Sequence, residues 1–331
     1  MTRFDGARRL ADAALEATVV GSFSRIGFAA RRALFDWDAE PVVEMSGRVA
    51  MVTGATGGLG VAAATALAQR NADVWIVGRD PQRIEAARRA IAAIAPDSSV
   101  TTAVADFAVL DDVRNLADRV HRSVPRPDVL IHNAGALTHD LRYTVDGLEV
   151  TAQVHVVAPF LLTTGLLPIL QNTGDARVIT VSSAGMYTQR LDLDALATPA
   201  VPFNGVRAYA NAKRAQVVLN ELWSKHHGAA GVGFHAMHPG WANTPGLRES
   251  LPRFRALMSP LLRTPSQGAD TIVWLATDPR ALDTNGQFWL DRRPRSVAPL
   301  PGTRTRDGDA ERCWNWCVDR AGVSATLEAG R

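Results

Sequence analysis

The sequence is poor in cysteine and has little net charge. Its 331 residues include two cysteines, Cys313 and Cys317, which are too few for a disulfide framework and supply at most half of a zinc site. We therefore expect no metal site and a reducing compartment. The 36 Lys and Arg residues nearly balance the 33 Asp and Glu residues. The resulting charge of +3 gives no argument for a nucleic-acid partner.

The sequence also lacks recognisable signals for membrane insertion or export. No stretch reads as a run of about 18 uncharged apolar residues, so we expect no membrane-spanning helix. The first residues lack a continuous apolar core followed by a small-residue cleavage site, which argues against a signal peptide. With a hydrophobic content of 47%, the composition is that of a globular chain, and we expect a cytoplasmic location.

Short apolar runs alternate with Ala-rich helical patterns from residue 48 onward. The strand-like runs span residues 49–53, 73–77, 100–105, 128–132, 177–182, 233–237 and 286–289. The helical patterns lie at about 59–70, 81–94, 109–123, 146–170, 204–227 and 266–277. Nearly all-apolar strands are buried on both faces, and their alternation with helices indicates parallel βαβ units. The sequence therefore predicts a single α/β domain over residues 46–300, with a Rossmann-like doubly wound sheet of about seven parallel strands.

Two extensions flank this domain. Residues 1–45 contain a helical stripe, interrupted by arginines, of Phe23, Ile26, Ala30, Leu34 and Trp37. This arm either packs on its own domain or a partner subunit, or it lies as an amphipathic helix in a membrane interface and makes the protein peripheral to a membrane. Residues 301–331 are predicted to form an Arg- and Asp-rich extension with a short helix near 309–321, in which the two cysteines pack.

A glycine-rich turn follows the first expected strand. It reads Thr53-Gly54-Ala55-Thr56-Gly57-Gly58-Leu59-Gly60, and a helix comes after it. Glycines permit a tight turn and let the backbone approach a pyrophosphate, while a helix N-terminus presents free N–H groups to that anion. In this strand–turn–helix context the motif predicts a dinucleotide site.

The end of the second expected strand indicates which dinucleotide is bound. An Asp or Glu there would bind the adenosine ribose, but the sequence has Gly78 and Arg79. Arg79 can pair with a 2′-phosphate through its planar guanidinium group. We therefore expect NADP(H) to be preferred, with NAD(H) as the alternative. Asp80 is expected to cap the helix that begins at Pro81.

Tyr209 and Lys213 lie four residues apart in a predicted helix, which places the phenol and the ammonium on one face. An ammonium beside a phenol favours the phenolate and lowers its pKa from about 10. Tyr209 could then donate and accept protons near neutral pH. Such pairs also arise by chance on solvated helices, so the pair needs further support.

That support comes from five motifs in a fixed order. They are the glycine turn, Asn133-Ala134-Gly135, Ser182-Ser183, Tyr209 with Lys213, and Pro239-Gly240. Together they resemble the short-chain dehydrogenase/reductase family over about residues 46–290. The segments 209–218, 237–246 and 288–292 are similar to the subgroup called dehydrogenase/reductase SDR-family member twelve. The resemblance implies an NAD(P)-dependent oxidoreductase that interconverts a carbonyl and an alcohol.

The resemblance also implies roles for single residues. Tyr209 would be the proton donor or acceptor, Ser183 would orient the substrate oxygen, and Lys213 would lower the pKa of Tyr209 and hold the nicotinamide ribose. The residues that would bind the cofactor are Thr53, Gly54, Thr56, Gly57, Gly58, Leu59, Gly60, Arg79, Asp106, Asn133, Ala134, Gly135, Tyr209, Lys213, Pro239, Gly240 and Thr244.

One position departs from the family pattern. His155 aligns where family members usually place an Asn that holds a water in a proton relay. His155 either replaces that Asn as a fourth catalytic residue, because imidazole can accept and donate protons, or it only fills the space. In the second case the chain would bind the dinucleotide without turnover and act as a sensor or scaffold.

The segment 241–265 is expected to cover the substrate as a lid. Its stripe of Leu247, Leu251, Phe254 and Leu257 favours a small apolar carbonyl or alcohol, although a stripe is also typical of core packing. Its arginines, Arg248, Arg253, Arg255 and Arg263, are expected to form a solvated face. An extra loop is expected at 187–206. The long helices at 146–170 and 204–227 pair subunits in many relatives, so a homo-oligomer is the family expectation.

Overall fold

The computed structural model describes residues 3–124 and 126–323. Within them lies an eight-stranded sheet with the spatial order β3-β2-β1-β4-β5-β6-β7-β8. The strands are β1 (Val49–Thr53), β2 (Asp73–Gly78), β3 (Val100–Val104), β4 (Val129–His132), β5 (Ala176–Val181), β6 (Val232–Met237), β7 (Phe288–Leu290) and β8 (Arg293–Pro294). Strands β1 to β7 are parallel, and β8 pairs antiparallel with β7. The predicted doubly wound α/β sheet is confirmed, with one short edge strand added.

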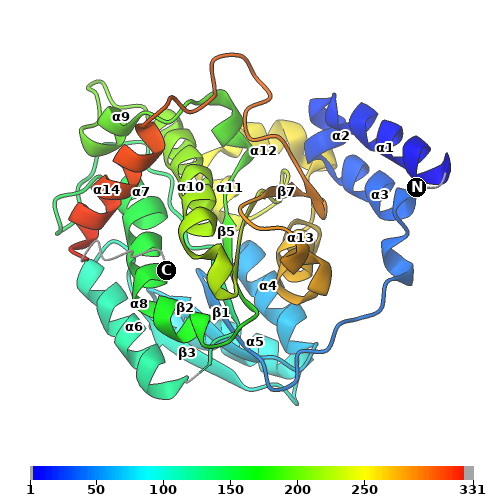
Figure 1. Ribbon diagram of the computed structural model, residues 1–331, viewed down its shortest axis with the longest axis horizontal. Coiled ribbons are helices and arrows are strands. Elements are labelled where there is room, and N and C mark those ends of the chain that lie inside the picture. Colours follow the sequence, from blue (N-terminus) through cyan, green and yellow to red (C-terminus); the bar gives the residue numbers. More distant parts are fainter. Residues whose placement is uncertain (1–2, 125, 324–331) are drawn as a thin grey trace.

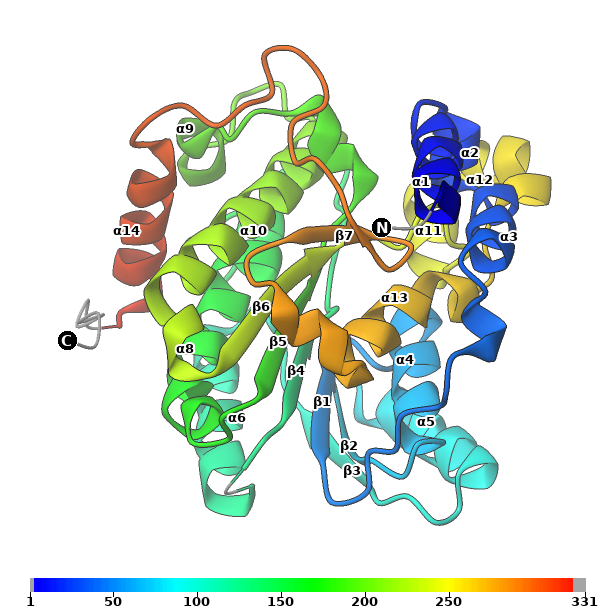
Figure 2. The ribbon, with the colours of Figure 1, turned by 45° about the vertical axis from the view of Figure 1, so that its right-hand side comes forward.

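Helices cover both faces of the sheet (Figures 1 and 2). One face carries α4 (Gly58–Ala68), α5 (Pro81–Ile94) and α13 (Pro265–Thr277), and the other carries α6 (Leu110–Ser123), α8 (Ala158–Gln171) and α10 (Gly205–His227). Each side has its own apolar cluster, because the strands between them are buried on both faces. Residues such as Ile76 and Ile131 are fully buried in the sheet.

The segment predicted as one helix at 146–170 is divided in the structure. It consists of α7 (Val150–Ala152), a π-helical turn (Gln153–Val157) and α8. The whole stretch is long and apolar enough to cross a membrane by length and composition, so the expectation that no such run exists is wrong. Because 78% of its most apolar window is buried inside the fold, it serves here as a core helix.

The N-terminal residues form three helices that lie beside the segment expected to be the substrate lid (Figure 2). They are α1 (Arg3–Glu16), α2 (Val19–Phe23) and α3 (Arg25–Leu34), and we call residues 3–39 the arm. Its buried face agrees only in part with the predicted stripe. Trp37 is buried as predicted, but Ile26 is 54% exposed, and the buried residues also include Phe28 and Arg31. The arm therefore packs on its own chain through a face that includes a charged residue.

The C-terminal extension ends in α14 (Asp309–Ala321), at the position predicted for a short helix. Trp314 packs edge-on against Phe160 of α8 and Trp223 of α10, with ring centroids 4.9 and 4.6 Å away. Cys313 and Cys317 are buried in the same contact. The described residues contain no group of three His, Cys, Asp or Glu side chains placed to hold a metal. Residues 324–331 of the predicted extension lie outside the described part.

Helix α14 lies against α10 and α8, the helices expected to pair subunits (Figure 1). The arm lies on the other side of the molecule (Figure 1). A subunit contact of the expected kind would have to include α14. The homo-oligomer thus stays a prediction. Of the two extensions, α14 is the one that lies on the helices expected to form the subunit contact.

We expect Trp314→Ala to lower the free energy of unfolding by about 3–5 kcal/mol, because it empties a buried aromatic site between two helices. Denaturant unfolding followed by circular dichroism measures the change. The control is Asn315→Ala, at the exposed neighbouring position of α14, which should change the free energy by less than about 0.5 kcal/mol. Equal losses in the two variants would contradict the packing role of Trp314.

Candidate active site

The glycine turn joins β1 to α4 at the carboxyl edge of the sheet. Gly54 and Gly58 have positive φ values of 67° and 55°, which glycine adopts without strain. A Cβ on Gly54 would lie 2.7 Å from the Cα of Ala134, and one on Gly60 would lie 2.4 Å from the oxygen of Gly54. These glycines therefore let the turn pack closely on the end of β4 and on its own helix.

The side chains of Thr53 and Asn133 stabilise this turn by hydrogen bonds to its backbone and to the end of β4. The hydroxyl of Thr53 accepts hydrogen bonds from the N–H groups of Asn133 and Ala134, at 3.0 and 3.1 Å. The side-chain amide of Asn133 donates to the carbonyls of Thr53 and Gly54, at 3.0 and 3.2 Å. Thr53 is fully buried, and its expected contact with a cofactor stays a prediction. Both residues shape the turn.

The outer side of the turn is open. A Cβ on Gly57 would have no neighbour closer than 3.8 Å. Beside it lies a hollow of about 470 Å³ lined by Thr56, Gly57, Gly58, Val61, Ala62, Arg83, Ala86, Ala87 and Pro265. Gly57 caps α4 without a side-chain hydrogen bond, so its cap leaves the first N–H groups of that helix open to a ligand. These donors and this space fit the diphosphate of a dinucleotide.

One arginine lines the hollow, and another follows the end of β2. Arg79 is exposed where β2 ends, and Arg83 lines the hollow itself. Asp80 caps α5 as predicted, accepting from the N–H groups of Gln82 and Arg83 at 2.9 and 3.1 Å. The sequence analysis missed Arg83. Its spacing of four residues from Arg79, across a helix start, was the available signal.

Other predicted cofactor residues surround the turn. Asp106 follows β3 and accepts from the N–H of Ala108 at 2.9 Å. Thr244 lies over the turn, since a Cβ on Gly58 would be 3.2 Å from the Cβ of Thr244. The side chain of Leu59 instead packs toward α13, where a Cβ on Gly268 would meet it at 2.5 Å. Leu59 can therefore offer a cofactor only its backbone.

Gly240 follows Pro239 at the end of β6, and its small size is required by other parts of the chain. Its φ is 70°, and a Cβ there would lie 2.4 Å from Nε of Arg263 and 2.7 Å from the carbonyl oxygen of Phe23. The expectation of a solvated face is wrong for Arg263, whose side chain is 1% exposed. It is buried because it has a carboxylate partner, Asp291.

Ser183, Tyr209 and Lys213 meet beyond the end of β5. The side chain of Ser183 is near enough to Tyr209 to stabilise its phenolate by hydrogen bonding. The ammonium of Lys213 donates to the carbonyl of Val181 at 2.8 Å and lies 5.5 Å from the centre of the Tyr209 ring. The structure thus brings together the three side chains expected to perform proton transfer.

The pKa values in this group differ from the expectation. Burial raises the pKa of Tyr209, and the hydrogen bond from Ser183 partly opposes this. Burial lowers the pKa of Lys213 to about 7. The expected lowering of the Tyr209 pKa by Lys213 is therefore not found, because an ammonium with such a low pKa is only partly charged near neutral pH.

His155 lies in the π-helical turn, with its ring 5.3 Å from the ring of Tyr209 and edge-on to it. Its Nε2 is 2.7 Å from the carbonyl oxygen of Ala136 and 3.1 Å from the N–H of that residue. A Cβ on Gly135 would lie 2.6 Å from the ring, so Gly135 makes room for it. Burial, with a contribution from Lys213, holds the pKa of His155 well below its usual range. The imidazole is neutral.

Gln216 is a neighbour of this turn that the sequence analysis missed. Its side-chain amide donates to the backbone carbonyl of His155 at 2.9 Å, and its side chain is buried. It lies one helical turn after Lys213, on the same face of α10, which was the available signal. Gln216 thereby ties the π-helical turn to the helix that carries Tyr209.

The lid contains α11 (Pro245–Ser250) and α12 (Pro252–Met258), separated at Leu251. This break divides the predicted stripe: Leu257 is 79% exposed, while Phe254 packs edge-on against Trp241 with ring centroids 5.5 Å apart.

The segment 187–206, expected as an extra loop, contains α9 (Leu193–Ala197). Asn211 anchors it by two hydrogen bonds to the backbone of Asp192, at 3.0 and 2.7 Å.

Comparison with known proteins identifies the family. A family model described as short chain dehydrogenase matches residues 48–253. The chain belongs to the short-chain dehydrogenase/reductase family. The predicted resemblance is confirmed, and the matched range includes β1 to β6 and every residue of the proton-transfer group. The arm and α14 lie outside it.

The relatives of this short-chain dehydrogenase/reductase include two human proteins. It is 38% identical to "Dehydrogenase/reductase SDR family member 12" over 82% of this chain and 85% of that protein. It is 30% identical to "Retinol dehydrogenase 12" over 85% of this chain and 88% of that protein.

Solved structures share the fold of this short-chain dehydrogenase/reductase. A "short chain dehydrogenase/reductase family protein" superposes with a TM-score of 0.60 at 27% identity, covering 74% of this chain and 96% of that one. L-Sorbose reductase from Gluconobacter frateurii, complexed with NADPH and L-sorbose, superposes with a TM-score of 0.60 at 20% identity, covering 75% and 95%. The second likeness shows the fold alone.

The low pKa of Lys213 predicts a pH-dependent stability. The pKa is about 7 in the folded protein and about 10.4 in an unfolded chain, so the unfolded chain binds more protons between these values. The free energy of unfolding should therefore rise from pH 7 to 9.5 relative to that of Lys213→Met, and the difference should be constant below pH 7. Denaturant unfolding at several pH values measures it.

The matched control is Lys225→Met, which removes an exposed lysine of the same helix. A difference between native protein and Lys213→Met that stays flat or falls from pH 7 to 9.5 would contradict a buried, weakly basic Lys213.

Proposed function

We propose that the protein is an NADP(H)-dependent oxidoreductase that interconverts a carbonyl and an alcohol on an apolar substrate. One observation carries this proposal: Ser183, Tyr209 and Lys213 meet at the same sheet edge as an open, glycine-lined cradle for a diphosphate. Family membership supports the reaction class, since the relatives named above are called dehydrogenases and reductases.

The chain offers a distinct group for each part of the cofactor. The N–H groups at the start of α4 would bind the diphosphate, and Arg79 with Arg83 would bind a 2′-phosphate. Lys213 would hold the nicotinamide ribose, because the carbonyl of Val181 fixes its ammonium. When bound, the nicotinamide supplies or accepts the hydride.

The proton chemistry belongs to Tyr209 and Ser183. The side chain of Ser183 is near enough to Tyr209 to influence its pKa, so one carbonyl oxygen could contact both hydroxyl groups. Burial raises the pKa of Tyr209, and a phenol with a raised pKa is protonated at neutral pH. The protonated Tyr209 could donate a proton to a carbonyl oxygen in the reducing direction, and its phenolate could accept one from an alcohol in the reverse direction.

The chemistry of the lid supports an apolar substrate. Trp241 and Phe254 form an aromatic pair on the segment after β6, and aromatic surface favours apolar ligands. The relative named Retinol dehydrogenase 12 is called after an apolar alcohol.

The second candidate is a dinucleotide-binding sensor or scaffold without turnover. It is favoured by His155, whose Nε2 is held at Ala136 and whose pKa lies too low for proton exchange near neutral pH. In family members an Asn at this position holds a water that relays protons. The neutral imidazole of His155 would not take up a proton in that relay near neutral pH. Activity measurements separate the two candidates.

Tyr209→Phe should lower the rate of NADPH oxidation with decanal or another apolar aldehyde or ketone by about 10²–10⁴-fold, the usual contribution of a general acid. Its affinity for NADPH should change little, because only the hydroxyl is removed. Absorbance at 340 nm follows the rate, and NADPH fluorescence follows binding. The control is Tyr143→Phe, which alters an exposed tyrosine.

Each outcome assigns the function. Turnover in the parent that Tyr209→Phe abolishes supports the oxidoreductase. Turnover in Tyr209→Phe equal to that of the parent contradicts the catalytic assignment. NADPH binding by the parent, with no turnover of any aldehyde or ketone tested, favours the sensor or scaffold.

Arg79→Asp should raise the Kd for NADPH at least about tenfold, because it replaces the partner of a phosphate by a like charge. The Kd for NADH, which lacks the 2′-phosphate, should change much less. Fluorescence titration measures both constants. Arg89→Asp is the control, since this exposed arginine pairs with Glu85 on the same helix. Unchanged NADPH affinity in Arg79→Asp would overturn the preference for NADP(H).

A further inference from the structure

The arm contacts the segment after β6 at the point where that segment leaves the sheet. The N–H of Trp241 donates to the carbonyl of Phe23 at 2.8 Å. The missing side chain of Gly240 makes this approach possible, because a Cβ there would lie 2.7 Å from the same carbonyl oxygen. The start of the lid is therefore bonded to the arm.

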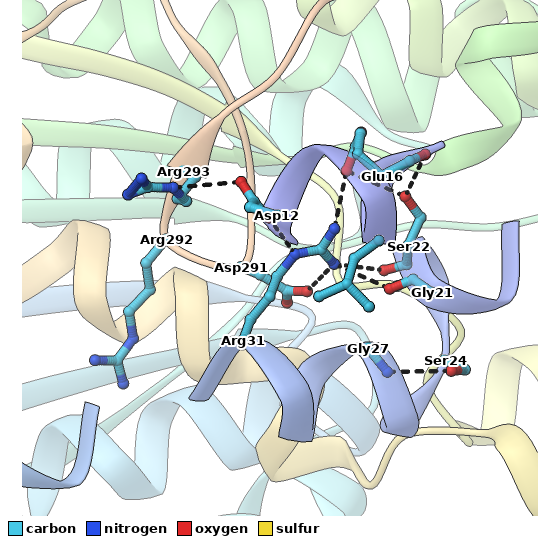
Figure 3. A network of polar contacts seen from close by, with 12 residues as sticks. Asp12, Glu16, Gly21, Ser22, Ser24, Gly27, Arg31, Asp291, Arg292 and Arg293 are labelled. Atoms are coloured by element: carbon cyan, nitrogen blue, oxygen red, sulfur yellow. Dashed lines mark hydrogen bonds and ion pairs between the residues drawn. The ribbon is translucent and has the colours of Figure 1, made fainter. Parts of the chain in front are cut away.

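The end of the lid is held through a buried carboxylate. Asp291, in the turn between β7 and β8, accepts from both terminal nitrogens of Arg263 at 2.6 and 2.9 Å. It also accepts from Nη1 of Arg31 on α3 at 2.9 Å (Figure 3). All three side chains are at most 1% exposed. Charge-assisted hydrogen bonds in such a dry site are short and strong.

The two arginines also share backbone of the arm. Nη1 of Arg31 donates to the carbonyl of Ser22 at 3.3 Å, and Nη2 of Arg263 donates to the same oxygen at 3.0 Å. Nε of Arg263 donates to the carbonyl of Ser24 at 3.2 Å. Both ends of the segment 240–263 are thus bonded directly to the arm.

An aromatic contact joins the arm to the two segments that border the proton-transfer group. The ring of Phe23 lies 5.7 Å from that of Trp241 and 6.3 Å from that of Tyr187. Tyr187 lies four residues after Ser183, and Trp241 lies two residues after Pro239. Phe23 therefore packs between the segment after β5 and the segment after β6.

We propose that the arm is a working part of the substrate site, and that Arg31 is a positioning residue that fixes the lid through Asp291 and Arg263. This inference rests on the proposed function, because it assigns the lid to an apolar carbonyl substrate. The family model begins at residue 48, so the arm lies outside the matched domain. Loosening it releases the lid at both ends and lowers the affinity for substrate.

Arg31→Met tests this with little risk to folding. Asp291 keeps both bonds to Arg263, and Asp12, a second partner of Arg31, keeps two bonds to Arg295 at 2.9 Å each. Glu16, the third carboxylate partner of Arg31, keeps an ion pair with Arg295 at 3.5 Å. None of these carboxylates is left without an arginine. The matched control is Arg32→Met, the next position of α3, where an exposed arginine pairs with exposed Asp38.

The readouts separate the lid from the rest of the protein. In hydrogen–deuterium exchange of the NADPH-bound enzyme, peptides from 240–263 should exchange about tenfold faster in Arg31→Met, while peptides from β1 to β4 stay unchanged. With decanal as substrate, KM should rise about tenfold while kcat and the Kd for NADPH change less than about twofold. Arg32→Met should match the parent in all four measurements.

Results that contradict the role of the arm can be distinguished from results that contradict the proposed function. A parent enzyme that reduces no aldehyde or ketone contradicts the proposed function. An active parent with unchanged exchange, or an unchanged KM, in Arg31→Met overturns the role of the arm, as does an equal effect in Arg32→Met. If Arg31→Met does not fold, Phe23→Ala replaces it with the same expected results, because it removes the aromatic contact and leaves every charge in place.

Discussion

The carboxylate of Asp291 is completely buried. Its burial links three separate segments: the arm, the end of the lid and the β7–β8 turn. Removing a carboxylate from water costs several kcal/mol unless its oxygens are paired. Arg31 and Arg263 satisfy both oxygens, and they come from the arm and from the end of the lid. Each of these two segments brings a buried arginine whose carboxylate partner is Asp291, so both segments are positioned against the same side chain. The β7–β8 edge of the sheet thus becomes the joint at which the arm and the lid meet.

Much of the fold could be predicted because local rules decide it. Strands buried on both faces appear as apolar runs, and the capping residue Asp80 before Pro81 marks the start of α5. The meeting of Ser183 with Tyr209 follows from the same rules. Parallel strands bring their carboxyl ends to one edge, so motifs far apart in sequence come together there.

The features that could not be predicted depend on contacts between distant residues. The segment that contains Arg263 has three other arginines, which suggests exposure to solvent. The burial of Arg263 depends on Asp291, 28 positions away, and on the carbonyls of Ser24 and Ser22, 239 and 241 positions away. The sequence suggests that Gly240 is part of a cofactor motif, whereas the structure shows that the arm packs closely against it. Likewise, a helical pattern places Lys213 beside Tyr209, but only the packed structure shows how far burial lowers the pKa of its ammonium.

The position of α14 has a consequence for how the chain is made. All eight strands precede this helix along the chain, so a ribosome has delivered the entire sheet before Trp314 emerges. Until then Phe160 and Trp223 lack the aromatic neighbour that covers them. The nascent protein therefore passes through a stage with a completed sheet and an exposed apolar face, the kind of surface that chaperones bind.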